Sequence, residues 1–403
     1  MRPLLLLLLL SAVVGSAQPV QVTGYYEPQV MIAHLDDDTY HMMSNKLRVD
    51  LSKTYGNALF AANFDYITYH GKTQWNLADF LPNRYQSLIS DFTYSFGDMV
   101  RSSGGGRFEH RPDRIFLDNA FVRLNFERFD LTLGKQQMGM GSGYTWNPTD
   151  LFNVKDIVDP TYEQPGHNAV TLNVPLSPRF SIHSYYAPGD EWKNSAKMFK
   201  VKGWLGRFDM SFMVISKEWT LREYTAMATD DQYKRTLFAT DIAGELLGLG
   251  VWAEGGYNRM NRQKPSQLHG KDDYWEWVLG TDYTFDSGLY VMSEWYHNGM
   301  MPDDSRHYSI SDWLWMLTGD VKSLCRDQLF AMFRYPVTDL ITAGMMSISS
   351  LSDGSIALVP MLEWSLYQDI ELTVYGNLYT GSDGQLYAAN MGNGGMARLR
   401  VYF

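Results

Sequence analysis

The sequence predicts an all-β protein, a single transmembrane antiparallel β-barrel of about 18 strands. Short segments that alternate apolar and polar side chains follow one another to the end of the chain. After the second segment, short and long connections alternate with few exceptions, as in barrels that cross a membrane. No window beyond the N-terminal region offers the roughly 18 uncharged apolar residues that a spanning helix needs.

The first 17 residues have the features of an export signal. Arg2 precedes an apolar run at 4–10, and small residues follow at 15–17. We therefore expect a signal peptide at 1–17 and one barrel domain at 18–403. No cysteine follows the small residues to accept a lipid, and the single Cys325 cannot form an internal disulfide.

Composition supports an exported β-protein and argues against one class of partner. The chain contains 26 Tyr, 12 Trp and 34 Gly, which suit aromatic girdles and tight turns. Mean hydropathy is −0.28, as a wet interior requires, although a large secreted β-protein could share these values. The net charge of −11 leaves no basic surplus to neutralise phosphates, so no nucleic-acid partner is expected.

The N-terminal half contains nine expected strands. In the second, Leu47, Val49 and Leu51 oppose Lys46, Arg48, Asp50 and Ser52, the cleanest alternation of this half. The segment 87–96 is compatible with a strand, a helix or a plug that folds into the barrel, and we leave it unassigned. The nine strands cover 22–34, 43–53, 58–69, 114–126, 129–138, 167–176, 179–187, 197–205 and 207–217.

The C-terminal half contains nine more. In the last one Ala397, Leu399, Val401 and Phe403 fall on one face, and Met396, Arg398, Arg400 and Tyr402 on the other. A terminal apolar face fits lipid, and the two arginines fit a wet lumen. These strands cover 235–245, 248–258, 273–285, 289–298, 328–336, 340–351, 355–366, 369–379 and 395–403.

Loop length separates the two rims of the expected barrel. Short turns at 54–57, 177–178, 206, 286–288 and 367–368 would lie on one side. Long loops would lie on the other side, at 70–113, 139–166, 219–234, 259–272, 299–327 and 380–394. A barrel threaded into the outer membrane from the periplasm places short turns inside and long loops outside.

With these features together, the mature chain resembles the porin-like barrels of the Gram-negative outer membrane. A narrower likeness is carried by Leu133-Gly134-Lys135-Gln136-Gln137 and the segment Gly-Ser-Gly-Tyr-Thr-Trp-Asn-Pro-Thr-Asp-Leu-Phe-Asn at 141–153. It resembles a strand-then-loop motif of porin-like families, which more often carry Arg where Lys135 stands. The resemblance implies contact with outer-membrane lipid and lipopolysaccharide, and assembly by the barrel-assembly machinery with Phe403 as its signal. Whether the barrel forms a homo-oligomer stays open.

Charged residues on the inward faces are the candidate selectivity residues. Charges are costly against lipid and ordinary in a watery lumen. Acids gather on the strands from 273 to 379 and many bases lie elsewhere, which predicts a transverse field. The alternative is that these ions pair across neighbouring strands. The candidates are Arg48, Asp50, Arg123, Lys200, Lys202, Lys217, Glu276, Asp282, Glu294, Arg334, Glu371, Arg398 and Arg400.

Two loops have features of their own. We expect 139–166 to fold inward and narrow the mouth, with Tyr144, Trp146, Asn147, Asp150 and Phe152 as the constriction residues, although packing against neighbouring loops is an equal alternative. Thr149 or Asp150 would cap a short helix at Leu151. The segment 311–317 predicts a capped amphipathic helical turn, on the outer leaflet or over the lumen.

The function predicted from these features is passive or weakly selective diffusion of small polar solutes. A non-conducting barrel that anchors or recognises partners would share the fold. An enzyme is not expected, since the sequence lacks His-x-x-x-His spacing, a Gly-x-Ser-x-Gly elbow and a phosphate-binding Gly-Lys-Ser or Gly-Lys-Thr. An outer-membrane hydrolase with a Ser and a His on the wall would leave no local signature. No cofactor or metal is expected.

Overall fold

The fold was analysed in a computed structural model. It describes residues 19–35, 38–73, 75–86, 93–94, 113–153, 163–222, 230–264 and 271–403. The predicted signal peptide at 1–17 lies outside this part, as does most of the segment 87–96.

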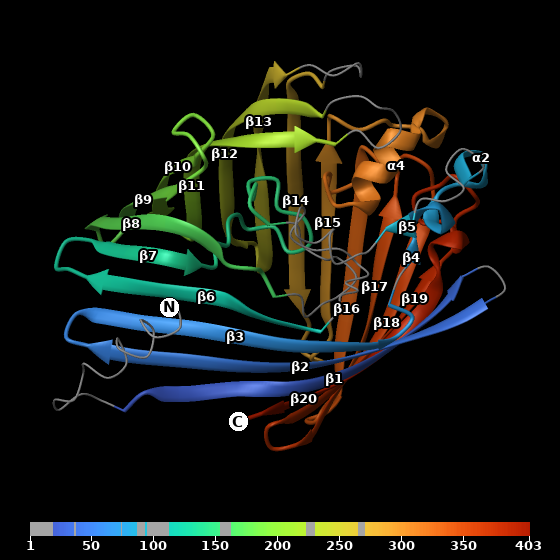
Figure 1. The fold of residues 1–403 in the computed structure, drawn as a ribbon, viewed down its shortest axis with the longest axis horizontal. Helices are drawn as coiled ribbons and strands as arrows, with labels where there is room; N and C mark the ends of the chain where they lie inside the picture. Colours follow the sequence, from blue (N-terminus) through green and yellow to red (C-terminus); the bar gives the residue numbers. More distant parts are fainter. Residues whose placement is uncertain are drawn as a thin grey trace.

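Eighteen antiparallel strands form one closed sheet (Figure 1). Each barrel strand pairs with the next along the chain, and the last pairs with the first, which leaves no free edge. The prediction of an all-β antiparallel barrel is confirmed. The strands are β1 Gln21–Leu35, β2 Asp38–Tyr55, β3 Ala58–Gly71, β6 Arg114–Asn125, β7 Asp130–Gln136, β8 His167–Ser177, β9 Phe180–Ala187, β10 Ala196–Leu205, β11 Phe208–Leu221, β12 Asp231–Leu246, β13 Leu249–Lys264, β14 Tyr274–Thr284, β15 Tyr290–Asn298, β16 Asp327–Thr338, β17 Ile341–Ser350, β18 Ile356–Tyr367, β19 Ile370–Tyr379 and β20 Asn393–Tyr402.

The remaining elements are short and lie in the connections. None of the described helices is long and apolar enough to cross a membrane. They are η1 Leu77–Phe80, α2 Asn83–Gln86, η2 Ser305–His307, α4 Ile310–Leu317 and η3 Ala389–Met391, together with a two-stranded sheet of β4 Trp75–Asn76 and β5 Thr93–Tyr94.

Alternation along each strand separates an apolar exterior from a charged interior. On β14 the outward Trp275 is 60% exposed, whereas the inward Glu276 on the next position is 2% exposed. Leu279 and Tyr283 repeat the outward pattern. Burying a large apolar side chain gains about 1.5–3 kcal/mol, so an exterior that leaves many of them uncovered is built to contact lipid.

The two rims differ as the loop lengths predict. Two-residue hairpins such as those at Gly56 and Gly248, both with positive φ, lie at the rim where β1 begins and β20 ends, which we call the terminus rim. The long connections lie at the opposite rim, the loop rim. Here β12 and β13 run further than predicted, because their pairing continues to Gln232 and Lys264. The connections expected at 219–234 and 259–272 are correspondingly shorter.

The helix α4 packs inside the loop rim against the wall formed by β15 to β17 (Figure 1). Trp313 and Leu314 are buried in the largest apolar cluster, together with Tyr296 and Phe330. Ser309 caps the helix in a reciprocal capping box with Asp312, so the helix begins slightly before the predicted segment 311–317. The expected position of this helix on the outer leaflet is therefore wrong.

Candidate functional site

The described residues of the connection between β7 and β8 lie inside the barrel. We call its described parts, residues 137–153 and 163–166, the inner loop. Two buried carboxylates on the opposing wall hold it. Glu254 accepts hydrogen bonds from the backbone N–H groups of Ser142 (2.6 Å), Gly143 (2.8 Å) and Thr149 (2.8 Å), and from the Thr149 hydroxyl (2.7 Å).

Glu294 makes the second attachment. It accepts from the N–H groups of Tyr144 (2.5 Å) and Thr145 (2.6 Å), and from the Trp252 indole (2.6 Å). Both carboxylates are almost completely buried. Burying a charge is costly unless charge-assisted hydrogen bonds compensate it, and here the loop backbone supplies them. The two carboxylates and the loop backbone therefore satisfy each other's hydrogen-bonding groups, which fixes the conformation of the loop.

Aromatic packing reinforces this attachment. Trp146 stacks on Tyr296 with ring centroids 5.0 Å apart, and it meets Phe330 edge-on. The Tyr144 side chain stays exposed, and Asn147 donates to the Met140 carbonyl at 2.8 Å.

The expected short helix at Leu151 is not formed by the described residues 151–153. The Asp150 carboxylate instead accepts from the N–H groups of Phe152 (2.8 Å) and Asn153 (3.0 Å) and from the Asn153 amide (2.9 Å). This is an Asx-type turn, in which the side chain satisfies the backbone that a helix would otherwise pair.

The far end of the inner loop is held by a second charge cluster. Glu163 accepts from Lys46 (2.9 Å), Arg48 (3.2 Å) and the Tyr25 hydroxyl (2.8 Å), and lies 3.6 Å from Arg400. Burial alone would raise the pKa of Glu163, but Lys46 and the other donors outweigh burial, so the pKa is below its ordinary value.

The two attachments lie on opposite sides of the barrel. Leaving β4 and β5 aside, β13 and β15 are the eleventh and thirteenth barrel strands, whereas β1, β2 and β20 are the first, second and eighteenth. In a closed ring of 18, strands about nine positions apart face each other across the lumen. The described parts of the inner loop thus contact two walls that face each other across the barrel.

Many of the inward ions form pairs between neighbouring strands. Because barrel closure places β20 between β1 and β19, Arg398 and Arg400 pair with Glu27, and Arg400 lies in register beside Glu371. The acids and bases therefore do not occupy separate arcs. The other pairs among the predicted residues are Arg48 with Asp50, Lys200 with Asp241, Lys202 with Asp209 and Arg334 with Glu363.

The remaining predicted residues have other partners. Arg123 donates to the Thr132 hydroxyl, and Asp282 accepts from the Tyr290 hydroxyl. Glu276 lies between Arg235 and Lys322, and Lys217 donates to the Leu151 carbonyl. Of the three carboxylates that hold the inner loop, Glu294 was among the candidates from the sequence, whereas Glu254 and Glu163 were missed. Glu254 stands beside Gly255 and Gly256, where alternation is weak, and Glu163 lies in a connection without periodicity.

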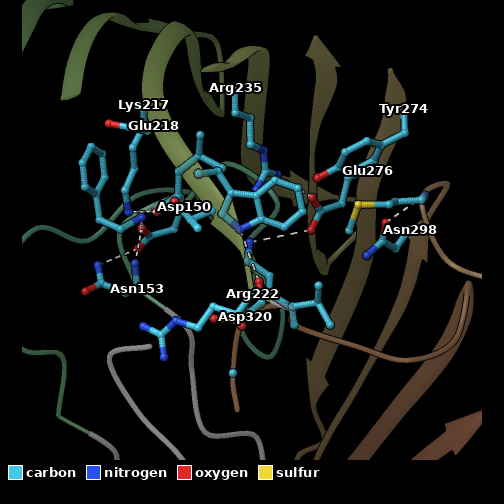
Figure 2. A pocket seen from close by; sticks show the side chains of 18 residues that line it. Asp150, Asn153, Lys217, Glu218, Arg222, Arg235, Tyr274, Glu276, Asn298 and Asp320 are labelled. Carbon is cyan, nitrogen blue, oxygen red and sulfur yellow. Dashed lines mark hydrogen bonds and ion pairs between the residues drawn. The ribbon is translucent and has the colours of Figure 1, made fainter. Parts of the chain in front are cut away.

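Two cavities flank the inner loop. One, of about 340 Å³, lies toward the loop rim between residues 150–153, the wall of β11 and β14, and residues 319–322 (Figure 2). The other, of about 760 Å³, lies toward the terminus rim, where Arg48, Glu163 and Arg400 line it beside Phe403. Among the described residues, no cluster of three or more metal-ligating side chains occurs.

Comparison with known proteins gives a fold but no sequence family. No family model and no curated protein matches the sequence. The chain is similar to OccAB4 of Acinetobacter baumannii, with a TM-score of 0.56 and 8% identity over 96% of this chain and 98% of that one. A triple mutant of the Rhodopseudomonas blastica porin aligns over 96% of this chain and all of that one, with a TM-score of 0.45 and 10% identity. With its closed barrel and apolar exterior, the chain has a porin-like barrel fold.

Proposed function

We propose that the protein is an outer-membrane channel for the passive or weakly selective diffusion of small polar solutes. One observation carries this proposal. The inner loop is attached to both walls by carboxylate contacts, and polar cavities lie on each side of it. A barrel of 18 strands that served only as an anchor would need no such internal narrowing.

The terminus rim then faces the periplasm and the loop rim faces the outside. Selectivity is weak in this proposal, since most inward ions already have partners of opposite charge. Arg123 is an exposed inward cation of the lumen lining that donates to a neutral hydroxyl. It should therefore contribute to the ion preference of the channel.

The partners of the channel follow from the same proposal. Outer-membrane lipid and lipopolysaccharide contact the apolar exterior and the loop rim. The barrel-assembly machinery recognises the last strand, where the Phe403 side chain is exposed and its backbone pairs with Gly24 at 3.0 Å in both directions.

Planar bilayer recording tests the proposal. Purified protein should give stepwise conductance, and Arg123→Glu should shift the reversal potential in a salt gradient toward cation preference. A protein that gives no steps, even with residues 139–166 deleted, is a non-conducting anchor. Lipid or polysaccharide turnover that depends on one Ser or His would instead establish a hydrolase.

A further inference from the structure

The cavity on the loop-rim side of the inner loop has an unusual balance of charge. Its lining includes Lys217 and Arg235 from the barrel wall (Figure 2), and Lys322 from the segment after α4. Glu276 of the barrel wall lies beside these cations, and both Arg235 and Lys322 pair with it. Arg235 lies 3.3 Å and Lys322 3.6 Å from its two oxygens, and the Tyr296 hydroxyl also donates to it at 2.8 Å.

The third cation has no carboxylate partner among the described residues. Lys217 donates to the Leu151 carbonyl at 2.8 Å, and no described carboxylate oxygen lies within 4.0 Å of its nitrogen. The Phe152 ring lies 5.1 Å away. An ammonium group that is half-buried with only a neutral acceptor retains most of its attraction for an anion.

The other acids of the lining do not offset this charge. The Asp150 carboxylate is already occupied by three N–H donors of the inner loop. Glu218 occupies an outward position of β11, and Figure 2 draws its carboxylate pointing away from the cavity. Arg222 and Asp320 contribute one charge of each sign. The described inward groups are therefore four cations against three acids.

We propose that this cavity is a binding subsite for the oxyanion group of an entering solute, held by Lys217, Arg235 and Lys322. Two lysines and an arginine provide several N–H donors to carboxylate, phosphate or sulfate oxygens. A volume of about 340 Å³ admits a small solute. The inference rests on the proposed channel function, because the subsite lies on the extracellular side of the inner loop where such a solute would arrive.

Calorimetric titration of the full-length barrel in detergent tests the subsite without requiring conductance. Sulfate, phosphate and succinate are the probes. At least one should bind, and Lys217→Gln should weaken that binding about tenfold, the loss of one charge-assisted hydrogen bond. Lys217→Arg should restore it. Glu276→Gln should strengthen binding, because it releases Arg235 and Lys322 from their shared acid.

Lys193→Gln is the matched control, since Lys193 is an exposed lysine of the connection between β9 and β10 that pairs with Glu191, and it should bind like the wild type. Preference for succinate over sulfate assigns organic acids, and the reverse assigns inorganic anions. Absence of binding by all three probes, or equal binding by Lys217→Gln, would overturn the subsite while leaving a conducting channel intact. Binding without any conductance would instead contradict the channel.

Discussion

The attachment of the inner loop to Glu254 gives the sharpest prediction. In Glu254→Gln, one carboxylate oxygen becomes an NH₂ group. Each oxygen now accepts from two donors, so whichever way the amide turns, at least one backbone N–H of Ser142, Gly143 or Thr149 loses its acceptor. An orphaned buried donor costs about 1–3 kcal/mol, and the bonds that remain lose their charge assistance.

The combined loss is roughly 2–4 kcal/mol. Since each 1.4 kcal/mol is a factor of ten, the population with a detached inner loop should rise about 30- to 1000-fold. Single-channel records should then show more frequent and larger openings. Hydrogen exchange of peptides covering 141–149 should accelerate, whereas exchange of the barrel strands should not change.

Glu245→Gln is the control, because Glu245 lies on the neighbouring strand β12 with an exposed side chain and a loose pair to Arg207 at 3.5 Å. An exposed pair contributes about 0–1 kcal/mol, so this variant should behave like the wild type. If Glu254→Gln matched the control in both conductance and hydrogen exchange, the carboxylate would not hold the loop.

Three further predictions follow from the same contacts. Gly141→Ala should detach the inner loop as Glu254→Gln does, because Gly141 has φ +85° and an added Cβ would collide with the Glu254 carboxylate. Gly139→Ala is its control and should leave conductance unchanged, because the nearest atom to an added Cβ there would be 3.5 Å away. Glu163→Gln should raise the rate of loop fluctuations at neutral pH. The pKa of Glu163 in the folded protein lies below its unfolded value of about 4.3. The ionised Glu163 therefore stabilises the wild-type inner loop fully above the unfolded value, and this stabilisation is lost as pH falls through the folded value. Current noise in wild-type recordings should accordingly rise only on acidification. Deleting Phe403 removes both backbone bonds to Gly24 and should reduce heat-modifiable barrel in the outer membrane without reducing export; normal insertion of that variant would argue against an assembly role.

The barrel was predictable from sequence because the alternation of apolar and polar side chains is visible within each short segment. Successive side chains of every strand point alternately to lipid and to the lumen. The sequence around Leu47 and Arg48 is therefore enough to predict which of the two points outward. Loop lengths then give the orientation of the rims. The inward fold of residues 137–153 also had a local signal, namely aromatic residues in a loop that has no lipid to contact.

Apart from the inward Glu294, the contacts that hold the inner loop could not be read from the sequence. A bulge opposite Asn63 and Phe64 turns both Asp118 and Asn119 inward, whereas strict alternation places only one of them there. Asp118 reaches Arg48 at 3.2 Å only because of this extra residue. Pairing between strands that are distant in sequence decided the rest, since Arg400 meets Glu27 across the closure of the ring.

Burial also settles the chemistry of the single cysteine. Cys325 lies beneath the loop rim, and burial raises the pKa of its thiol to about 12, so the thiol stays protonated at neutral pH. It serves as a small packing residue, in agreement with the absence of a disulfide partner in the sequence.

The central claim is that the inner loop narrows a conducting lumen, and paired single-channel recordings of the wild type and Glu254→Gln test it most directly. The account predicts discrete steps from the wild type and larger, noisier steps from the variant at the same salt concentration. Silent membranes with both proteins, when heat modifiability confirms that each barrel is folded, would contradict it.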